Sequence, residues 1–77
     1  MNITVEFVGT IDTGPYKQEE SFSPEEGASV GDFLKKLHFQ PSHLKYIQVV
    51  RNGKRASHNS ELKDGDHLEL MLMVGGG

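Results

Sequence analysis

The sequence has no cysteine, no excess of basic residues and no long hydrophobic run. The absence of cysteine excludes a disulfide scaffold, a thiolate zinc site, an iron–sulfur cluster and a cysteine nucleophile. The apolar stretches fall short of the roughly 20 residues that span a bilayer, and the N-terminus lacks the basic-then-apolar order of a signal peptide. We therefore expect a cytoplasmic protein without a membrane partner.

Positive charge is scarce as well, with 8 Lys and Arg residues against 11 Asp and Glu residues and a formal net charge of −3. Nucleic-acid-binding domains normally carry a basic stripe, and the Lys54-Arg55 pair is too small to form one. At 77 residues, the chain is one small domain. A domain of this size can seldom build an enclosed ligand cavity of about 300 Å³, so the composition favours a carrier or interaction module over an enzyme.

The first half of the chain predicts two strands and a helix. Alternating apolar residues indicate a strand over residues 2–8, and a charged run over residues 16–22 indicates an edge strand. Ser29 is a good N-cap, and Asp32 follows three residues later, as in a capping box. The helix predicted from Ser29 places four apolar residues on one face, namely Val30, Phe33, Leu34 and Leu37.

The second half predicts three further strands. β-formers fill residues 46–51, and Asn52-Gly53 is a hairpin turn that leads into a short return strand. Leu62 is an isolated apolar anchor beneath a polar loop. The last strand, over residues 67–74, alternates Leu68, Leu70 and Leu72 with Glu69, Met71 and Met73. The order of these elements predicts a two-layer α+β fold.

This second half resembles that of the ThiS/MoaD sulfur-carrier proteins. The shared features are the strand ending in Asn52-Gly53, the segment from Leu62 to Asp66, the alternating last strand and the terminal glycines. The position of the helix extends the resemblance to nearly the whole chain. It implies a β-grasp, ubiquitin-like fold, in which a mixed sheet packs on one helix. We expect a single domain over residues 1–74 and a flexible glycine tail over residues 75–77.

The resemblance also implies a function in which Gly77 is the reacting residue. Its carboxylate is expected to be adenylated by a ThiF/MoeB-like activating enzyme, which uses ATP and magnesium. A sulfur donor then converts it to a thiocarboxylate, which an acceptor synthase consumes in cofactor biosynthesis of the thiamine or molybdopterin type. The chain is thus a co-substrate that binds no cofactor itself. Gly75 and Gly76 lack a Cβ atom and suit a tail that threads a narrow channel.

Two other functions stay open at this point. A ubiquitin-like modifier would be joined to a target lysine through Gly77 after the same adenylation step. Alternatively, a β-grasp interaction domain would carry an inert tail, since chain ends are often disordered.

The sheet face opposite the helix is a candidate docking surface. Met71, Met73 and Val50 are expected to point from it, and methionine adapts well to irregular partner surfaces. Scattered exposed apolar residues are also normal in monomers. Glu69 and Glu6 are expected to form an acidic rim that complements a basic surface on the activating enzyme.

The four histidines do not suggest a metal site by their spacing. None of His38, His43, His58 and His67 pairs with another at the i, i+4 helical spacing, and no cysteine accompanies them. We interpret them as surface histidines and predict no bound metal.

Overall fold

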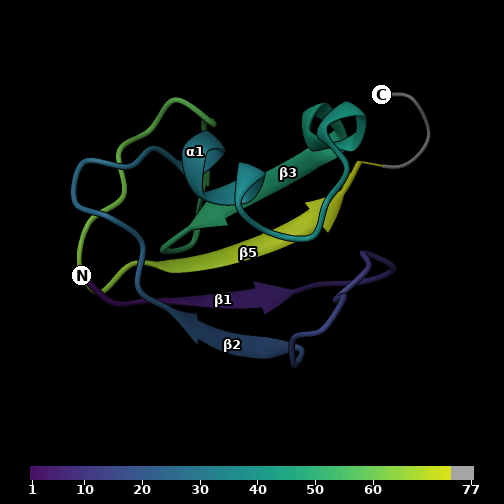
Figure 1. The fold of residues 1–77 in the computed structure, drawn as a ribbon, viewed down its shortest axis with the longest axis horizontal. Helices are drawn as coiled ribbons and strands as arrows, with labels where there is room; N and C mark the ends of the chain where they lie inside the picture. The colour runs from purple at the N-terminus through teal and green to yellow at the C-terminus, as the bar shows by residue number, and fades with distance from the viewer. Residues whose placement is uncertain (74–77) are drawn as a thin grey trace.

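The computed structural model describes residues 1–73. Five strands form one mixed sheet in the order β2-β1-β5-β3-β4 (Figure 1). The central strands β1 and β5 run parallel, whereas β2, β3 and β4 each pair antiparallel with a neighbour. The elements are β1 (Ile3–Phe7), β2 (Glu19–Phe22), α1 (Val30–Lys35), a 3₁₀ helix (Pro41–Tyr46), β3 (Ile47–Arg51), β4 (Lys54–Ala56) and β5 (His67–Leu72).

The start of α1 follows the predicted capping chemistry. The backbone N–H of Asp32 donates to Ser29 Oγ at 3.0 Å, and the backbone N–H of Ser29 donates to Asp32 Oδ2 at 3.1 Å. These reciprocal bonds satisfy donors that a helix start otherwise leaves unpaired. The helix ends at Lys35, earlier than expected, but Leu37 still packs against the core.

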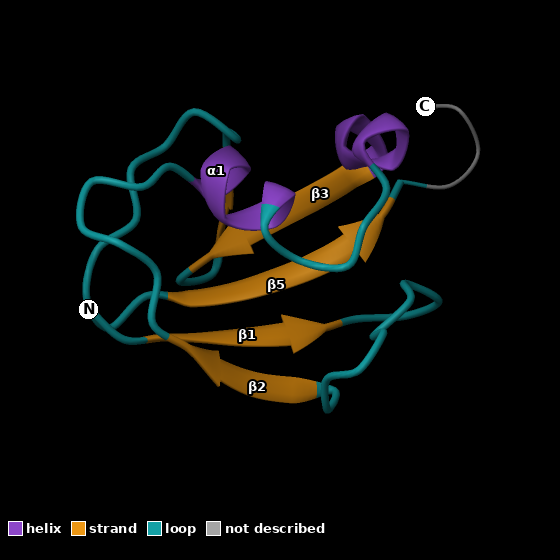
Figure 2. Ribbon diagram, in the orientation of Figure 1, coloured by secondary structure: helices purple, strands orange, loops and turns teal. Residues whose placement is uncertain are grey.

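The core lies between one face of the sheet and the helical layer (Figure 2). The burial of β1 and β5 alternates residue by residue, which confirms that each strand presents one face to the core. Leu62 is 1% exposed and anchors its loop as predicted. No helix within residues 1–73 is long and apolar enough to cross a membrane. The buried apolar residues are Ile3, Val5, Phe7, Ile11, Val30, Phe33, Leu34, Ile47, Val49, Leu62, Leu68 and Leu70.

Further boundaries differ from the sequence prediction, and β5 ends at Leu72, before the predicted end of the last strand. The second strand begins at Glu19, because Tyr16 lies in the preceding loop and its ring stacks on Phe7. Pro41 does more than end α1: it begins the 3₁₀ helix, where its fixed φ is favourable and its missing N–H costs nothing. Tyr46, predicted to begin a strand, is the last residue of that helix. The domain boundary predicted at residue 74 lies outside the described residues.

Candidate functional site

The predicted reacting residue Gly77 and the threading residues Gly75 and Gly76 lie outside the described residues. The structure shows where the chain leaves the sheet to reach them. The backbone N–H of Met73 donates to the Tyr46 carbonyl at 2.9 Å, and Leu72 pairs with the first residue of β3. The end of β5 therefore lies beside the last residue of the 3₁₀ helix.

Exposed apolar side chains gather at this end of β5. Tyr46 is 49% exposed, Leu72 37% and Met73 42%. The sequence grouped Leu72 with the buried Leu68 and Leu70, and the alternation is correct. However, Leu72 lies at the rim of the core and lines a hollow of about 210 Å³. The sequence did not identify Tyr46 or Leu72 as surface residues.

Three of the predicted docking residues, Val50, Glu69 and Met71, share one surface. We define the outer face as the side of the sheet opposite α1. It is formed by Thr4, Glu6, Glu19, Gln48, Val50, Arg55, His67, Glu69 and Met71. Val50 lies opposite Glu69, and Met71 lies opposite Gln48, all of them half-buried. Met73 follows the end of β5 and lines a hollow together with Gln48 and Arg55. The structure therefore brings Val50, Glu69 and Met71 together, while their role in docking stays a prediction.

Charge on the outer face changes sign across the sheet. Glu6 lies opposite Glu69 on one side and opposite Glu19 on the other, which confirms that Glu6 and Glu69 share a face. Val50, by contrast, lies opposite Arg55 of β4. The strands β2, β1 and β5 thus form an acidic half, and β4 contributes a basic edge. The sequence analysis missed this edge because strand pairing decides where Arg55 lies.

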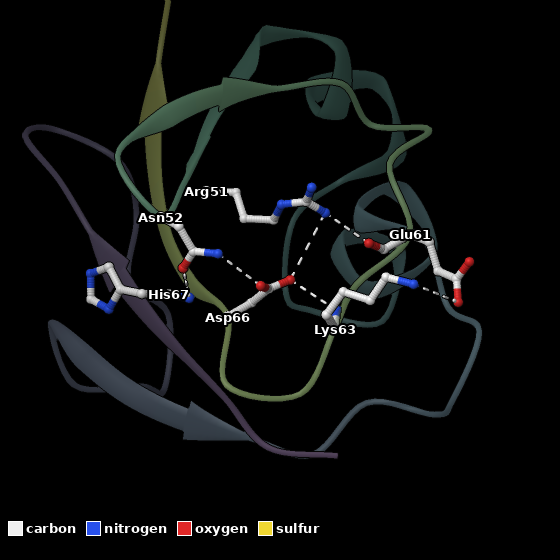
Figure 3. Close-up of polar contacts among 6 residues, drawn as sticks. All are labelled: Arg51, Asn52, Glu61, Lys63, Asp66 and His67. Carbon is white, nitrogen blue, oxygen red and sulfur yellow. Dashed lines mark hydrogen bonds and ion pairs between the residues drawn. The ribbon is translucent and has the colours of Figure 1, made fainter.

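A polar network fixes the start of β5 (Figure 3). The carboxylate of Asp66 is buried and accepts bonds from the Asn52 side chain at 2.9 Å and the Lys63 backbone N–H at 2.8 Å. Arg51 Nη1 lies 3.9 Å from the same carboxylate. The Asn52 side chain also accepts a bond from the backbone N–H of His67 at 2.9 Å. The hairpin turn and the first residue of β5 are thereby held in a fixed relation.

Two of the four histidines are structural, which corrects their interpretation as surface residues. The His38 ring packs on Phe39, and its Nε2 lies 2.6 Å from the Asp12 carbonyl, to which it donates. His58 is half-buried and donates through Nε2 to a β3 carbonyl at 2.8 Å. His43 is exposed, as expected.

His67 has a different environment from the other three. The pairing of β1 with β5 brings its ring beside Glu6 and Glu69 on the outer face. The search for paired histidines in the sequence missed this group, because its members come together through strand pairing.

A comparison of the sequence with known families gives a match. The sequence profile described as the ThiS family matches residues 5–77. The chain belongs to the ThiS family. The match covers all five strands, apart from the first two residues of β1, and the glycine tail. A comparison with curated protein sequences gives no match.

Solved structures resemble this ThiS-family chain over at least 95% of its length. SAMP1 from Haloferax volcanii has a TM-score of 0.74 at 21% identity and covers 100% of both chains. A protein described as putative molybdopterin converting factor subunit 1 from Pyrococcus furiosus has a TM-score of 0.74 at 22% identity, covering 95% of this chain and 98% of its own. A complex of subunits 1 and 2 of the molybdopterin-converting factor from Helicobacter pylori has a TM-score of 0.64 at 22% identity, with 100% coverage of both chains. These likenesses confirm the β-grasp fold.

Proposed function

We propose that this chain is a sulfur carrier whose Gly77 carboxylate is adenylated and then converted to a thiocarboxylate. The observation that carries the proposal is the ThiS-family match, which runs through β5 and continues to residue 77. The domain supplies a stable body, and the tail supplies the reacting group. This role needs no acid, base or nucleophile other than the terminal carboxylate.

The chemistry proceeds in two substitutions. An oxygen of the Gly77 carboxylate attacks the α-phosphorus of ATP, and pyrophosphate leaves. Hydrosulfide (HS⁻) released by the sulfur donor then attacks the acyl carbon, AMP leaves with the oxygen that joined it to phosphorus, and loss of the S–H proton leaves the thiocarboxylate. We assign ATP and magnesium binding to a ThiF/MoeB-like activating enzyme, and we assign consumption of the thiocarboxylate to an acceptor synthase of the thiamine or molybdopterin type.

Docking on the activating enzyme is assigned to the outer face and the adjoining end of β5. Val50, Met71 and Met73 supply apolar contact area there, while Glu69 supplies negative charge beside it. The fixed start of β5 suits this role, because a rigid docking surface loses little conformational entropy on binding.

Conjugation to a protein lysine is the second candidate. It is favoured by the structural likeness to a protein whose printed description is small archaeal modifier protein 1, with a TM-score of 0.75 at 21% identity. Both candidates require an adenylate at Gly77. They differ in the nucleophile that displaces AMP, which is a sulfur donor in one case and a lysine amine in the other.

Intact mass spectrometry separates the two candidates. The protein, untagged at its C-terminus, is co-expressed with a candidate activating enzyme and a sulfur donor. The carrier proposal expects a mass increase equal to replacing one oxygen by one sulfur, located in the peptide that ends at Gly77. An isopeptide between Gly77 and a target lysine, without this mass increase, would instead establish the modifier.

A variant that lacks Gly76 and Gly77 is the matched control, because it leaves the described domain untouched. It is expected to lose the mass increase and ATP-dependent adenylation while melting at the same temperature. If the truncated protein retains its biological activity, the tail is inert and the chain is an interaction domain.

A further inference from the structure

Three metal-ligating side chains meet on the outer face. Glu6 of β1 lies directly opposite Glu69 of β5, and His67 precedes Glu69 by two residues, so all three share one side of the sheet. One donor atom from each lies within 4.8 Å of the other two. His67 Nε2 is 3.6 Å from Glu6 Oε1.

The group stands on two strands in the interior of the sheet. Its members come from the parallel central strands β1 and β5, which are flanked by paired strands on both sides. The network around Asp66 fixes the His67 backbone through Asn52, and the imidazole ring points away from that network (Figure 3). Sites on paired strands hold their ligands more accurately than sites on loops.

The charge around the group favours a cation. Glu6 faces Glu69 across one strand pair and Glu19 across the other, and like charges directly opposite each other destabilise a sheet. Within residues 1–73, the only ion pair of Glu6 is with His67, and Glu69 forms none. A bound cation would remove the repulsion between carboxylates and hold them together.

We propose that Glu6, His67 and Glu69 form a binding site for a divalent transition-metal ion, with zinc as the best fit. An imidazole nitrogen and carboxylate oxygens are ligands that zinc accepts, whereas magnesium and calcium prefer oxygen ligands alone. All three ligands approach from the sheet, so the remaining coordination positions face solvent. Those positions are filled by water or by a donor from a protein seated on the outer face. This inference does not depend on the chemistry of the tail.

Isothermal titration calorimetry of the full chain with Zn²⁺ tests the site. His67→Ala is expected to weaken zinc binding by at least about tenfold, because even residues that only orient metal ligands contribute 10- to 100-fold to affinity. His43→Ala is the matched control, since it removes an exposed histidine far from the group in sequence. The zinc affinity of His43→Ala is expected to stay within about twofold of the wild-type value, well below the 10- to 100-fold losses seen when residues around a metal site are replaced.

A second variant separates loss of zinc binding from misfolding. Glu69→Gln keeps the size of the side chain and removes the charge opposite Glu6. It is expected to melt no lower than the wild type without zinc and to lose zinc affinity to a similar extent. Zn²⁺ is expected to raise the melting temperature of the wild type and of His43→Ala, but not that of His67→Ala.

Amide NMR spectra locate the ion. Zn²⁺ is expected to shift the signals of β1 and of the first half of β5, while Mg²⁺ at the same concentration leaves them in place. The proposal is overturned if Zn²⁺ gives neither heat nor shifts, if His67→Ala binds as tightly as the wild type, or if the shifts centre on His43 or His58.

Discussion

Asn52 Nδ2 donates to Asp66 Oδ1 across 2.9 Å and so joins the β3–β4 turn to the loop that precedes β5. Asn52 is also the only residue other than glycine with a positive φ, at 52°, within the described part of the chain. Asparagine tolerates this conformation and can bond locally, which few other residues do. A turn residue that sequence reasoning assigns only to a hairpin therefore also positions the last strand.

Replacement of Asp66 by alanine is expected to lower the free energy of unfolding by about 2–3 kcal/mol. It removes a buried carboxylate and leaves the Lys63 N–H and the Asn52 amide, in partly buried positions, without their acceptor. Urea denaturation measures the loss. Glu61→Ala is the control, since its side chain joins only an exposed ion pair with Lys63, and a change below about 0.5 kcal/mol is expected. Equal losses in both variants would contradict a special role for Asp66.

Replacement of Leu62 by alanine is expected to cost about 2–4 kcal/mol, because it opens a cavity under the loop that it anchors. Leu62 is 1% exposed, and its backbone N–H donates to the Ala28 carbonyl near the start of α1. Thermal and urea denaturation check the loss. Leu62→Met, which keeps most of the volume, is expected to lose less than about 1.5 kcal/mol. A loss in Leu62→Ala no larger than in Leu62→Met would show that the loop does not depend on this anchor.

Replacement of Gly14 by alanine tests the contact with His38. Gly14 has a φ of +59°, and an added Cβ would lie 2.6 Å from the His38 ring. Gly27 has a φ of +83° with nothing within 4 Å, so Gly27→Ala measures the conformational strain alone. We expect Gly27→Ala to cost about 1 kcal/mol and Gly14→Ala to cost about 1–3 kcal/mol more. Thermal melting of the two variants measures both losses of stability. Equal losses in Gly14→Ala and Gly27→Ala would contradict a steric clash with His38.

Removal of the Asp32 side chain is expected to lower stability at neutral pH and to matter less in acid. Hydrogen bonding by the Ser29 backbone N–H, and then by the Ser29 side chain, lowers the pKa of Asp32 from its usual value of 3.8. A carboxyl group with a lowered pKa stabilises the folded state above its unfolded pKa. This stabilisation is lost as the pH falls from about 3.8 through the lower, folded-state pKa. Urea denaturation of Asp32→Ala and of the wild type at pH 7 and at pH 2 measures the loss of unfolding free energy. An equal loss at both pH values would contradict a contribution from the ionised Asp32 carboxylate.

Local chemistry made much of the fold predictable. The Ser29 cap, the Asn52-Gly53 turn and the alternation in β1 and β5 each depend on residues a few positions apart, and the structure confirms them. The edge position of β2 was also predicted from its charges, and the strand order confirms it. The sequence analysis missed the 3₁₀ helix that begins at Pro41, because a proline can either end one helix or occupy the first turn of the next.

The candidate site was less predictable, because it depends on strand pairing. Glu6 and Glu69 are far apart in sequence, and only the parallel register of β1 and β5 places them opposite each other with His67 beside them. The exposure of Leu72 likewise depends on where the core ends. The burial of His38 depends on an aromatic cluster assembled from separate segments. The assignment of Gly77 came from family resemblance and stays a prediction.

The parallel pairing of β1 with β5 also constrains how the chain folds. The first strand can join the rest of the sheet only when the last strand is present, because β5 lies between β1 and β3. Most contacts of the fold therefore join segments that are distant in sequence. Such topologies fold more slowly than helical bundles. A chain truncated before residue 67 lacks the strand that joins the β1–β2 pair to the β3–β4 pair, so the five-stranded sheet forms only after β5 has been synthesised.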